Sequence, residues 1–407
     1  MRPLTSVLRS PHVPRLLTAS LVGRLPTGMA PLAIVLSVRD HGGDYRLAGA
    51  LTALYAGSAA LCGPVLGRFI DRTRQPPMLL GCAVVSAAAF LLLAALDPVR
   101  APLLAGCAAI VAGAATPQLE PCLRVLWEDL VRGERAVRAA FSLDAATQEL
   151  IFVCGPLVVL AAVGAGPASG LVAAAVIGLL GTAWFATARP ARRWRGVPSA
   201  RHWAGPLRAP GVLRLFAGLA CVGLTIGAFT VGITGYAEAE GHSSAAGWLI
   251  ALNAGGALLG GLAYTAVPVA RREDRRLLVL LALLAAGYLP LLLVPEPLLL
   301  APLAFLSGCA LPAVLASEFA LIARMAPAGT LTEAHAWMIT SFGVGNAVGS
   351  ALAGTALDLV SPAAAFALSV VSGGVAVALA APGFLAQARC SEKKVSTRSH
   401  ASSDDSW

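Results

Sequence analysis

The sequence has little charge for its length. Only 13% of its 407 residues are charged, whereas 57% are hydrophobic. A water-soluble domain of this size cannot bury so large an apolar fraction, so a soluble globular fold is excluded. Lysine is nearly absent as well, since Lys393 and Lys394 are the only two and arginine supplies the other 28 basic residues. We interpret that bias, together with the high alanine content, as an effect of genome composition.

Several catalytic and ligand-binding patterns are also missing. There is no Gly-Lys-Ser/Thr loop to hold ATP phosphates, so the chain itself is not a primary pump. There are no paired loop acids, no nucleophile motif and no His/Cys cluster with metal-ligand spacing. Seven of the eight cysteines lie inside apolar runs, where free thiols act as small hydrophobic groups. The sequence therefore predicts no enzyme activity, no cofactor and no metal site.

Long apolar runs dominate the chain instead. Residues 77–96, 168–188 and 277–294 are each close to the roughly 20 residues that cross a bilayer as a helix. The sequence predicts an all-α membrane protein with twelve transmembrane helices. The predicted spans are 14–38, 46–68, 77–96, 101–126, 139–163, 168–188, 211–236, 245–268, 276–294, 297–323, 331–357 and 362–386.

The basic residues predict the orientation of these spans. With the N-terminus in the cytoplasm, 25 of the basic residues fall in cytoplasmic segments and only Arg39, Arg46 and Arg100 fall on the opposite side. Cytoplasmic loops of membrane proteins carry such an excess of Lys and Arg. We therefore expect a multi-pass protein of the cell membrane with both termini in the cytoplasm. The same asymmetry explains the net charge of +9 without a nucleic-acid partner.

The two halves of the chain resemble each other. Residues 49–72 align without a gap on residues 247–270, at an offset of 198 residues. The shared positions are Gly49/Gly247, Ala53/Ala251, Leu54/Leu252, Ala56/Ala254, Gly57/Gly255, Leu61/Leu259 and Gly63/Gly261. A weaker second repeat pairs GAATP at 113–117 with GCALP at 308–312. A duplicated half made of apolar helices is typical of secondary transporters, whose two lobes move about a central site.

The repeat predicts four segments. Residues 1–188 form a six-helix N-terminal lobe and residues 211–386 form a pseudo-symmetric six-helix C-terminal lobe. The basic segment 189–210 is a cytoplasmic linker that meets anionic lipid headgroups. The polar, Ser-rich segment 387–407 is a disordered cytoplasmic tail.

The loop after the second span carries a recognisable motif. It reads GRFIDRTR at 67–74, with Gly67, Asp71, Arg72 and Arg74 in characteristic places. With the twelve spans and the doubled half, this chain resembles the major facilitator superfamily over about residues 10–388. Arg74 stands where that family usually has a second glycine. The equivalent loop of the second half, VARREDRR at 269–276, keeps its charge but has lost the Gly and the Asp at the positions that match Gly67 and Asp71.

The motif has a physical interpretation as a gate. Asp71 lies at the end of a helix and can pair with a cation or a helix N-terminus across the interface between the lobes. Breaking such a contact would let the cytoplasmic side open. Arg72 and Arg74 belong to the same motif, although each one alone is also explained as an ordinary cytoplasmic loop charge.

Five charged residues lie inside N-terminal spans, where a charge at the bilayer centre costs about 2.5–3.5 kcal/mol. They are Arg24 in the first span, Glu120 and Arg124 in the fourth, and Asp144 and Glu149 in the fifth. Glu120 and Arg124 are four residues apart and can pair on one helix face. Arg24 then needs Glu149 or Asp144 as its counter-charge. Asp144 is nearer the cytoplasmic end, where it could instead be a solvated acid at a helix start.

These charges have a functional and a structural interpretation. A carboxylate beside an arginine in a switching cavity can bind a proton in one state and release it in the other. On that interpretation Glu149, Asp144 and Arg24 couple protons to transport, with Glu149 as the deepest acid. The alternative is a structural ion-pair network that holds the first, fourth and fifth helices together.

The family resemblance implies that those helices border a central cavity. Candidate cavity residues from both halves are Arg24, Tyr55, Glu120, Arg124, Asn253, Glu318 and Asn346. Tyr55 and Asn253 occupy matching places in the repeat. The second half contributes few polar groups, so the cavity has one charged wall and one apolar wall. Such a cavity suits an amphiphilic organic solute better than a sugar.

The leading hypothesis is a monomeric secondary active transporter that works by alternating access. It would export small amphiphilic organic molecules in exchange for protons, as a drug or metabolite efflux antiporter. One alternative is an importer of a small anionic metabolite held by Arg24. Another, from a different class, is a membrane sensor that transports nothing.

Overall fold

The computed structural model describes residues 7–164, 166, 168–196, 205–239, 243–267, 272–293 and 296–401. Within these ranges every regular element is a helix. The first half contains α2 (Val13–Asp40), α3 (Tyr45–Arg72), α4 (Gln75–Ala95), α5 (Pro102–Ala114), α6 (Leu119–Arg124), α7 (Trp127–Leu130), α8 (Glu134–Val163), α9 (Ser169–Ala186) and α10 (Arg189–Arg193). The second half contains η1 (Gly205–Arg208), α11 (Pro210–Ala239), α12 (Ser243–Tyr264), α13 (Glu273–Tyr288), η2 (Leu289–Leu293), α14 (Pro297–Gly308), α15 (Leu311–Met325), α16 (Leu331–Leu359) and α17 (Pro362–Ala401).

The helices match the predicted spans in order and position. Eleven segments of the described chain are long and apolar enough to cross a membrane. The place of the remaining predicted span, 331–357, is taken by α16. That helix has sufficient length, but Asn346 and several glycine and serine residues near its middle make it less apolar. The all-helical prediction is confirmed, and a count of twelve is consistent with this arrangement.

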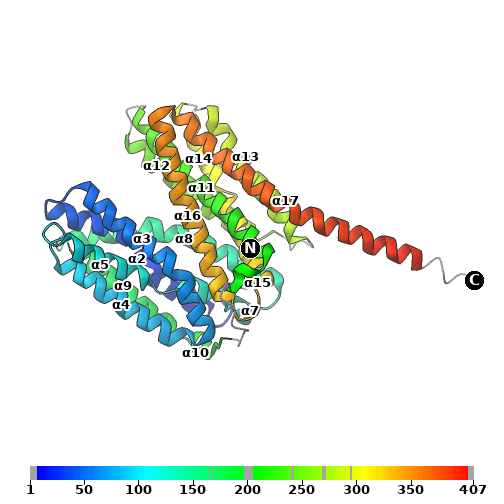
Figure 1. Ribbon diagram of the computed structural model, residues 1–407, viewed down its shortest axis with the longest axis horizontal. Coiled ribbons are helices and arrows are strands. Elements are labelled where there is room, and N and C mark those ends of the chain that lie inside the picture. The colour runs from blue at the N-terminus through cyan, green and yellow to red at the C-terminus, as the bar shows by residue number, and fades with distance from the viewer. Residues whose placement is uncertain are drawn as a thin grey trace, which may run out of the picture.

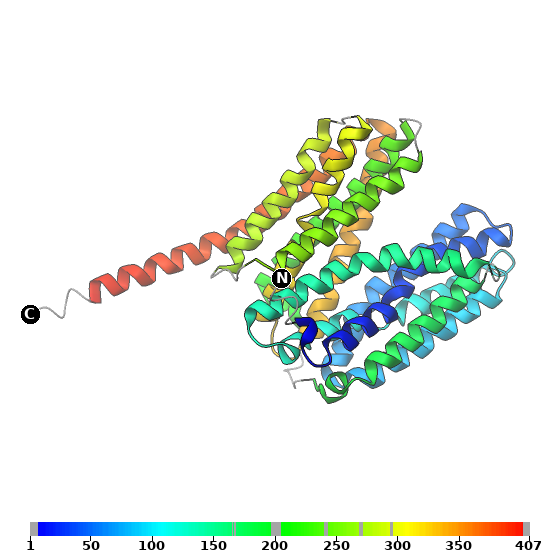
Figure 2. The same ribbon diagram turned by 180° about the vertical axis from the view of Figure 1, so that it is seen from behind.

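The helices form two bundles that divide the chain near its middle (Figures 1 and 2). In the first bundle α2 packs against α8 and α9, and in the second α11 packs against α16 and α17. These are the first, fifth and sixth predicted spans of each half. The two bundles therefore repeat the same packing, as the sequence repeat predicts.

Two predicted spans are broken rather than continuous. The span 101–126 divides into α5 and α6 around Pro117, and the span 297–323 divides into α14 and α15 just before Pro312. Pro117 lies in the first interruption, because proline has no backbone N–H and disfavours helical geometry in the residue before it. Each pair of helices still forms one segment long and apolar enough to cross a membrane, as predicted, and the two interruptions are equivalent in the GAATP and GCALP repeats.

The two sequence repeats meet inside each lobe. Gly113 of α5 packs against the main chain of Tyr55 on α3, and Gly308 of α14 packs against the main chain of Asn253 on α12. A Cβ atom at either glycine would overlap the carbonyl oxygen of its partner. Each repeat thus contains a glycine that is needed for close helix contact.

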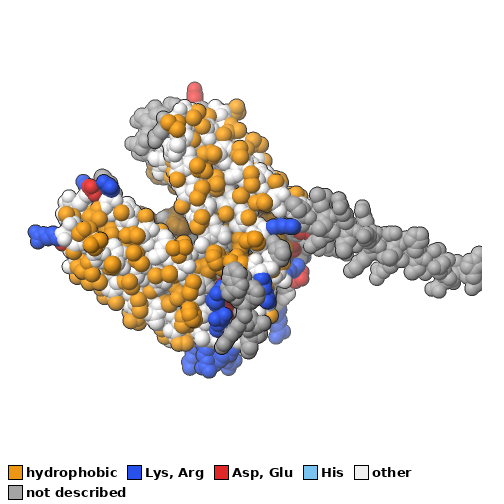
Figure 3. All heavy atoms as spheres, in the orientation of Figure 1, with side chains coloured by type: hydrophobic (Ala, Val, Ile, Leu, Met, Phe, Trp, Pro, Cys, Tyr) orange, Lys and Arg blue, Asp and Glu red, His pale blue; other side chains and the backbone are white. Residues whose placement is uncertain are grey.

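Within the described residues the lobes touch each other at one end. The main cross-lobe packing is between α3 and α16, and between α8 and both α12 and α15, with a smaller contact between α6 and α16. From this contact the two bundles diverge, which leaves a notch between them in Figure 3. Most Lys and Arg side chains on that face lie at the end where the lobes meet. We call it the arginine-rich end. Its position in the cytoplasm remains a prediction.

The last helix continues beyond its predicted limit. The backbone of α17 is helical to Ala401, whereas the sequence predicts the end of the span at residue 386. Residues 402–407 and residues 197–204 of the predicted linker lie outside the described residues. The disordered tail stays a prediction.

The glycine contacts can be tested by adding single methyl groups. We expect Gly113→Ala and Gly308→Ala each to destabilise the protein by about 1–3 kcal/mol, because overpacking displaces the facing helix. The controls are Gly57→Ala and Gly247→Ala, whose added Cβ atoms meet nothing within 4 Å. Thermal unfolding in detergent measures all four, and equal midpoints would contradict the packing argument.

Candidate functional site

Four charged side chains form a closed ring inside the N-terminal lobe. Arg24 of α2 contacts Glu120 of α6 (Nη2 to Oε2, 2.5 Å) and Asp144 of α8 (Nη1 to Oδ1, 3.3 Å). Arg124 of α6 contacts the same two acids, through Nη2 to Glu120 and through Nε to Asp144 Oδ2 at 2.9 Å. Each acid is therefore shared by two arginines, and the ring has no net charge.

Local features of the helices bring these groups together. The break at Pro117 starts the short helix α6, which places Glu120 in its first turn and Arg124 in its last. Both charges are favourable there, because they oppose the helix dipole. Next to Arg24, Gly23 lets α2 approach the main chain of α9 at Gly181. The ring therefore sits where three tightly packed elements converge.

Burial makes the pairing in this ring obligatory. The Asp144 side chain is 0% exposed and that of Arg124 is 2% exposed, whereas Glu120 is 14% exposed. Removing one partner from a buried ion pair typically costs about 3–5 kcal/mol, because the other charge is left without compensation. The predicted pairing of Glu120 with Arg124 is confirmed. Of the two alternatives for Asp144, the counter-charge to Arg24 is confirmed and the solvated acid is wrong, since the fold buries it between two arginines.

The ring of four charged residues, which we call the charge ring, contacts the opposite lobe through an aromatic side chain. The guanidinium carbon of Arg124 lies 3.4 Å from the ring centre of Phe319 on α15. Phe319 in turn packs against Phe141 of α8, with ring centres 6.2 Å apart. A guanidinium over an aromatic face is attracted by its quadrupole. Sequence reasoning missed both phenylalanines, because an aromatic residue in an apolar helix carries no distinguishing signal.

Asp71 joins the lobes by capping a helix of its neighbour. Its Oδ1 accepts a hydrogen bond from the Thr332 backbone N–H (3.0 Å), and its Oδ2 accepts one from Glu333 (2.8 Å). These N–H groups belong to the first turn of α16, whose own N-cap residue, Thr330, provides no side-chain bond. A carboxylate at a helix N-terminus satisfies such unpaired donors and complements the helix dipole.

Neighbouring residues of α3 extend this contact between Asp71 and the first turn of α16, which we call the latch. Arg68 forms two hydrogen bonds to the Glu333 carboxylate, from Nη2 at 2.5 Å and from Nε at 3.0 Å. A Cβ on Gly67 would lie 2.9 Å from the Glu333 Cα, so glycine is needed where α3 meets α16. The structure therefore brings Gly67 and Asp71 of the predicted motif to the interface. Arg72 and Arg74 are exposed and make no ion pair within the described residues.

The segment between the lobes packs on both partners of the latch. Gly196, which follows α10, lies against the main-chain carbonyl of Asp71. Gly205, at the start of η1, lies against the carboxylate of Glu333 and has a φ of 50°. A left-handed backbone at this position favours glycine.

Other polar contacts cross the same end of the molecule. Arg138 of α8 pairs with Glu273 of α13, and both side chains are 5% exposed. Ser142 donates a hydrogen bond to the Gly261 carbonyl at 2.6 Å. Nearer the surface, Arg324 pairs with Glu134 at 2.9 Å. Glu273 of the VARREDRR loop therefore has a cross-lobe contact, although its partner is an arginine and not a helix end.

Residues 16–301 match the family model of the Major Facilitator Superfamily. This chain belongs to the Major Facilitator Superfamily. Its structure is also similar to two structures of a bacterial homologue of the iron transporter ferroportin in the outward-facing state, the second with soaked iron. Each is 14% identical to this chain, and each match covers 90% of this chain and 98% of the solved chain, with TM-scores of 0.72 and 0.70.

A third solved structure, the human organic anion transporter MFSD10 (TETRAN), is 16% identical with a TM-score of 0.62. It covers 91% of this chain and 100% of that chain. The comparison with curated proteins finds no match. At such low identities the structural likeness shows the fold alone. Family and fold together make this protein a multi-pass membrane transporter of the Major Facilitator Superfamily rather than an enzyme.

The predicted cavity residues do not all come together in this superfamily fold. Tyr55 stacks on Phe90 with ring centres 5.6 Å apart, inside the N-terminal lobe. Asn253 is buried in the C-terminal lobe, where its Nδ2 donates to the Ala304 carbonyl (3.1 Å) and to Ser307 Oγ (2.9 Å). The matching positions of the repeat therefore hold their own lobes together.

The remaining two candidates are in the C-terminal lobe. Asn346 is half-buried on α16, and its main chain packs against Gly223 and Gly227 of α11. Glu318 on α15 is 1% exposed, and its Oε2 makes no hydrogen bond within the described residues. The backbone of Glu149 is part of α8, but its side chain lies outside the described residues.

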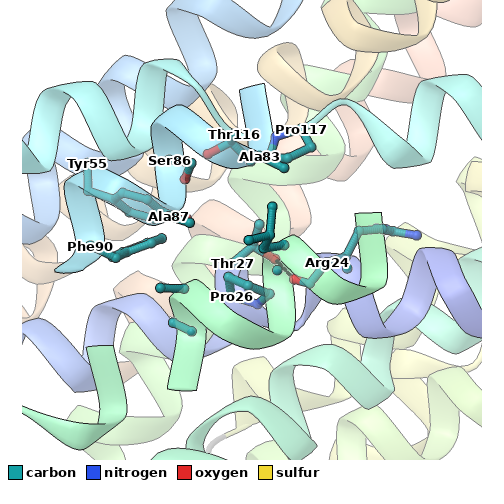
Figure 4. Close-up of a pocket in the computed structure, with 15 residues that line it drawn as sticks. Arg24, Pro26, Thr27, Tyr55, Ala83, Ser86, Ala87, Phe90, Thr116 and Pro117 are labelled. Carbon is teal, nitrogen blue, oxygen red and sulfur yellow. Dashed lines mark hydrogen bonds between the residues drawn. The ribbon is translucent and has the colours of Figure 1, made fainter. Parts of the chain in front are cut away.

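A small cavity connects Arg24 with Tyr55 inside the N-terminal lobe (Figure 4). Its volume is about 30 Å³, which is enough for one or two water molecules and not for an organic solute. Ser86 and Thr116 also line it. Among the described residues no three His, Cys, Asp or Glu side chains gather closely enough to hold a metal ion.

The ring predicts a large difference between two acid-to-amide changes. We expect Asp144→Asn to destabilise the protein by about 3–5 kcal/mol, because two buried guanidinium groups lose a shared counter-charge. Glu134→Gln should cost less than about 1 kcal/mol, because its pair with Arg324 is exposed. Thermal unfolding of the solubilised proteins measures both. A full-stability Asp144→Asn protein would refute the structural role of the ring.

Proposed function

We propose that this protein is a secondary active transporter that exports small amphiphilic organic molecules in exchange for protons. The observation that carries the proposal is the contact of Arg124 with both the charge ring and Phe319 of the opposite lobe. A change in the ring would thereby alter the strength of the contact between lobes. Coupling of ion binding to lobe movement requires such a shared group.

Alternating access is supported by the distribution of contacts. The latch, the Arg138–Glu273 pair and the Arg124–Phe319 contact all join the two lobes, and the lobes diverge from the end where they meet. If that end is cytoplasmic, as the arginines predict, this state is open to the outside. Transport then requires these contacts to break and equivalent ones to form at the other end.

We assign the transported proton to an acid in or near the charge ring. Asp144 is fully buried, and each of its oxygens contacts a different arginine, so it is shielded from water. Glu120 is the more exposed acid of the ring, and each of its oxygens faces a different arginine. We therefore add Glu120 to the predicted candidate Glu149, with Arg24 as the counter-charge that remains when the acid is neutralised.

The composition of the lobes supports an amphiphilic solute. Arg24, Glu120, Arg124 and Asp144 give the N-terminal lobe its polar site, whereas Asn253 of the C-terminal lobe is occupied with contacts inside its own lobe. Import of an anion held by Arg24 has less support, because Arg24 is already paired with two acids. We further propose that the protein acts as a monomer in the cell membrane with both termini in the cytoplasm.

The latch gives a prediction about opening. In Asp71→Asn the capping charge is lost, and hydrogen bonds to charged groups contribute about 1.5–3 kcal/mol. We expect the arginine-rich end to open about tenfold more often. A cysteine at position 332 reports this in protein without native cysteines, because the Thr332 side chain is 0% exposed while the lobes are in contact.

The reporter cysteine should react with a thiol reagent about tenfold faster in Asp71→Asn than in the parent. The matched control is Arg72→Gln, since Arg72 is exposed next to Asp71 and should leave the rate unchanged. Equal rates for the Asp71→Asn protein and its parent would show that Asp71 does not gate this end.

Transport by purified protein in liposomes tests the proposed function. With dyes, antibiotics and organic acids as the panel, a pH gradient should drive accumulation of cationic or neutral amphiphiles. We expect Glu120→Gln and Glu149→Gln each to reduce gradient-driven transport at least about tenfold, because a permanently neutral side chain cannot exchange a proton. Counterflow without a gradient should persist.

The control for these variants is Glu128→Gln, an exposed acid outside the ring. Gradient-driven transport that survives in both Glu120→Gln and Glu149→Gln would exclude both acids as proton carriers. Transport of organic anions, or of ferrous iron, in place of amphiphiles would instead replace the proposed substrate class. An absence of flux for every compound would favour a sensor.

A further inference from the structure

A histidine that belongs to neither the charge ring nor the latch lies in the interface between the lobes. His335 is in the second turn of α16, and its side chain is 0% exposed. The centre of its ring lies 6.2 Å from that of Phe141 on α8 and 6.3 Å from that of Phe319 on α15. The imidazole is therefore held between aromatic side chains from both lobes.

The hydrogen bonding of this imidazole is incomplete. Within the described residues neither ring nitrogen makes a hydrogen bond of ordinary geometry. The main-chain carbonyls of Leu331 and Phe319 nevertheless lie beside the ring, and both belong to the same lobe as His335. A neutral imidazole has one N–H group and an imidazolium has two. Acceptors for both groups of the protonated ring are thus present.

The charges that face His335 come from the N-terminal lobe. Arg124 of α6 lies over Phe319, which also contacts the imidazole, and Glu120 is paired with that arginine. The aromatic residues on α8 and α15 that touch the ring carry no charge. Burial and Arg124 therefore both favour the neutral ring while the lobes are in contact.

The other titratable groups of the surrounding helices have different partners or positions. On α3, Asp71 caps α16 and Arg68 binds Glu333, which is on the same helix as His335. On α8, Asp144 binds Arg124 and Arg138 binds Glu273. On α15, Glu318 is adjacent in sequence to Phe319 and is itself buried. Arg124 is thus the main electrostatic control on His335.

A cavity leads from the arginine-rich surface toward this histidine. It has a volume of about 420 Å³, and its walls come from both lobes, including Arg132, Arg138, Glu273 and Arg324. Phe141 lines the same cavity and also contacts His335. Movement of Phe141 away from the imidazole would connect His335 to water on that side.

We propose that His335 is a proton-binding site that makes opening of the arginine-rich end depend on the pH of that side. When the lobes separate, His335 leaves Arg124 and Phe141 but keeps the carbonyls of Leu331 and Phe319. The ring then takes up a proton from water, and the new charge opposes closure against Arg124. The inference rests on the alternating opening proposed above, and it requires neither a particular substrate nor proton-coupled transport.

The distance between the lobes at this end is the direct readout. Spin labels at Arg74 and Ala328, two exposed positions on opposite sides of the interface, report it in protein without native cysteines. Between about pH 8 and pH 5 the open fraction should rise, with a limit of about tenfold per pH unit for one linked proton. His335→Gln should remove this dependence. The control His41→Gln, at the opposite end of α2, should retain it.

The outcomes separate this inference from the proposed function. A His335→Gln protein that opens with acid as the parent does would overturn the inference. So would a parent protein whose open fraction does not change with pH, if the Asp71→Asn variant does open. If His335→Gln does not fold, the ¹³C resonance of the His335 ring in otherwise native protein decides the point. It should titrate in both proteins, and at a higher pH in Asp71→Asn, because that variant is open more often than the parent. Loss of efflux with an intact pH response would count against proton-coupled export alone.

Discussion

The first turn of α16 begins with backbone N–H groups that its N-cap residue, Thr330, does not satisfy through its side chain, and Asp71 of the other lobe accepts hydrogen bonds from two of them. In a low-dielectric environment an unpaired donor is costly, so the closed interface is favoured wherever this carboxylate can reach. Gly67 permits the approach, and Arg68 neutralises the nearby Glu333. The stacking of Phe319 on Arg124 and the burial of His335 depend on the same closure.

The charge ring and the latch solve related problems by different means. The ring compensates buried charges within one lobe, so it persists whether the lobes are together or apart. The latch compensates a helix end only across the interface, so it exists in one state alone. Arg124 connects the two, because it is a member of the ring and also the group on which Phe319 packs. A transporter needs both a permanent site for charge and a contact that can be broken.

Much of this architecture was predictable because the bilayer limits the choices. The apolar runs, the repeat and the GRFIDRTR motif led to the correct helices and family, and the spacing of Glu120 and Arg124 led to a correct pair. The breaks at Pro117 and Pro312 were missed, since membrane helices often tolerate proline. Two positions for Asp144, solvated acid and counter-charge of Arg24, stayed open because sequence position alone does not give depth. Phe319 and His335 could not be found, since which helix face meets the other lobe depends on tertiary packing.

The two glycines that flank the undescribed part of the linker have a mechanical consequence. Gly196 rests on Asp71 and Gly205 rests on Glu333, so the two residues that bound this part of the linker are held on opposite lobes, beside the contact that must break. When this end opens, the distance between Gly196 and Gly205 increases, because each glycine moves with its own lobe. The linker is thus a tether whose fixed number of residues limits the amplitude of opening.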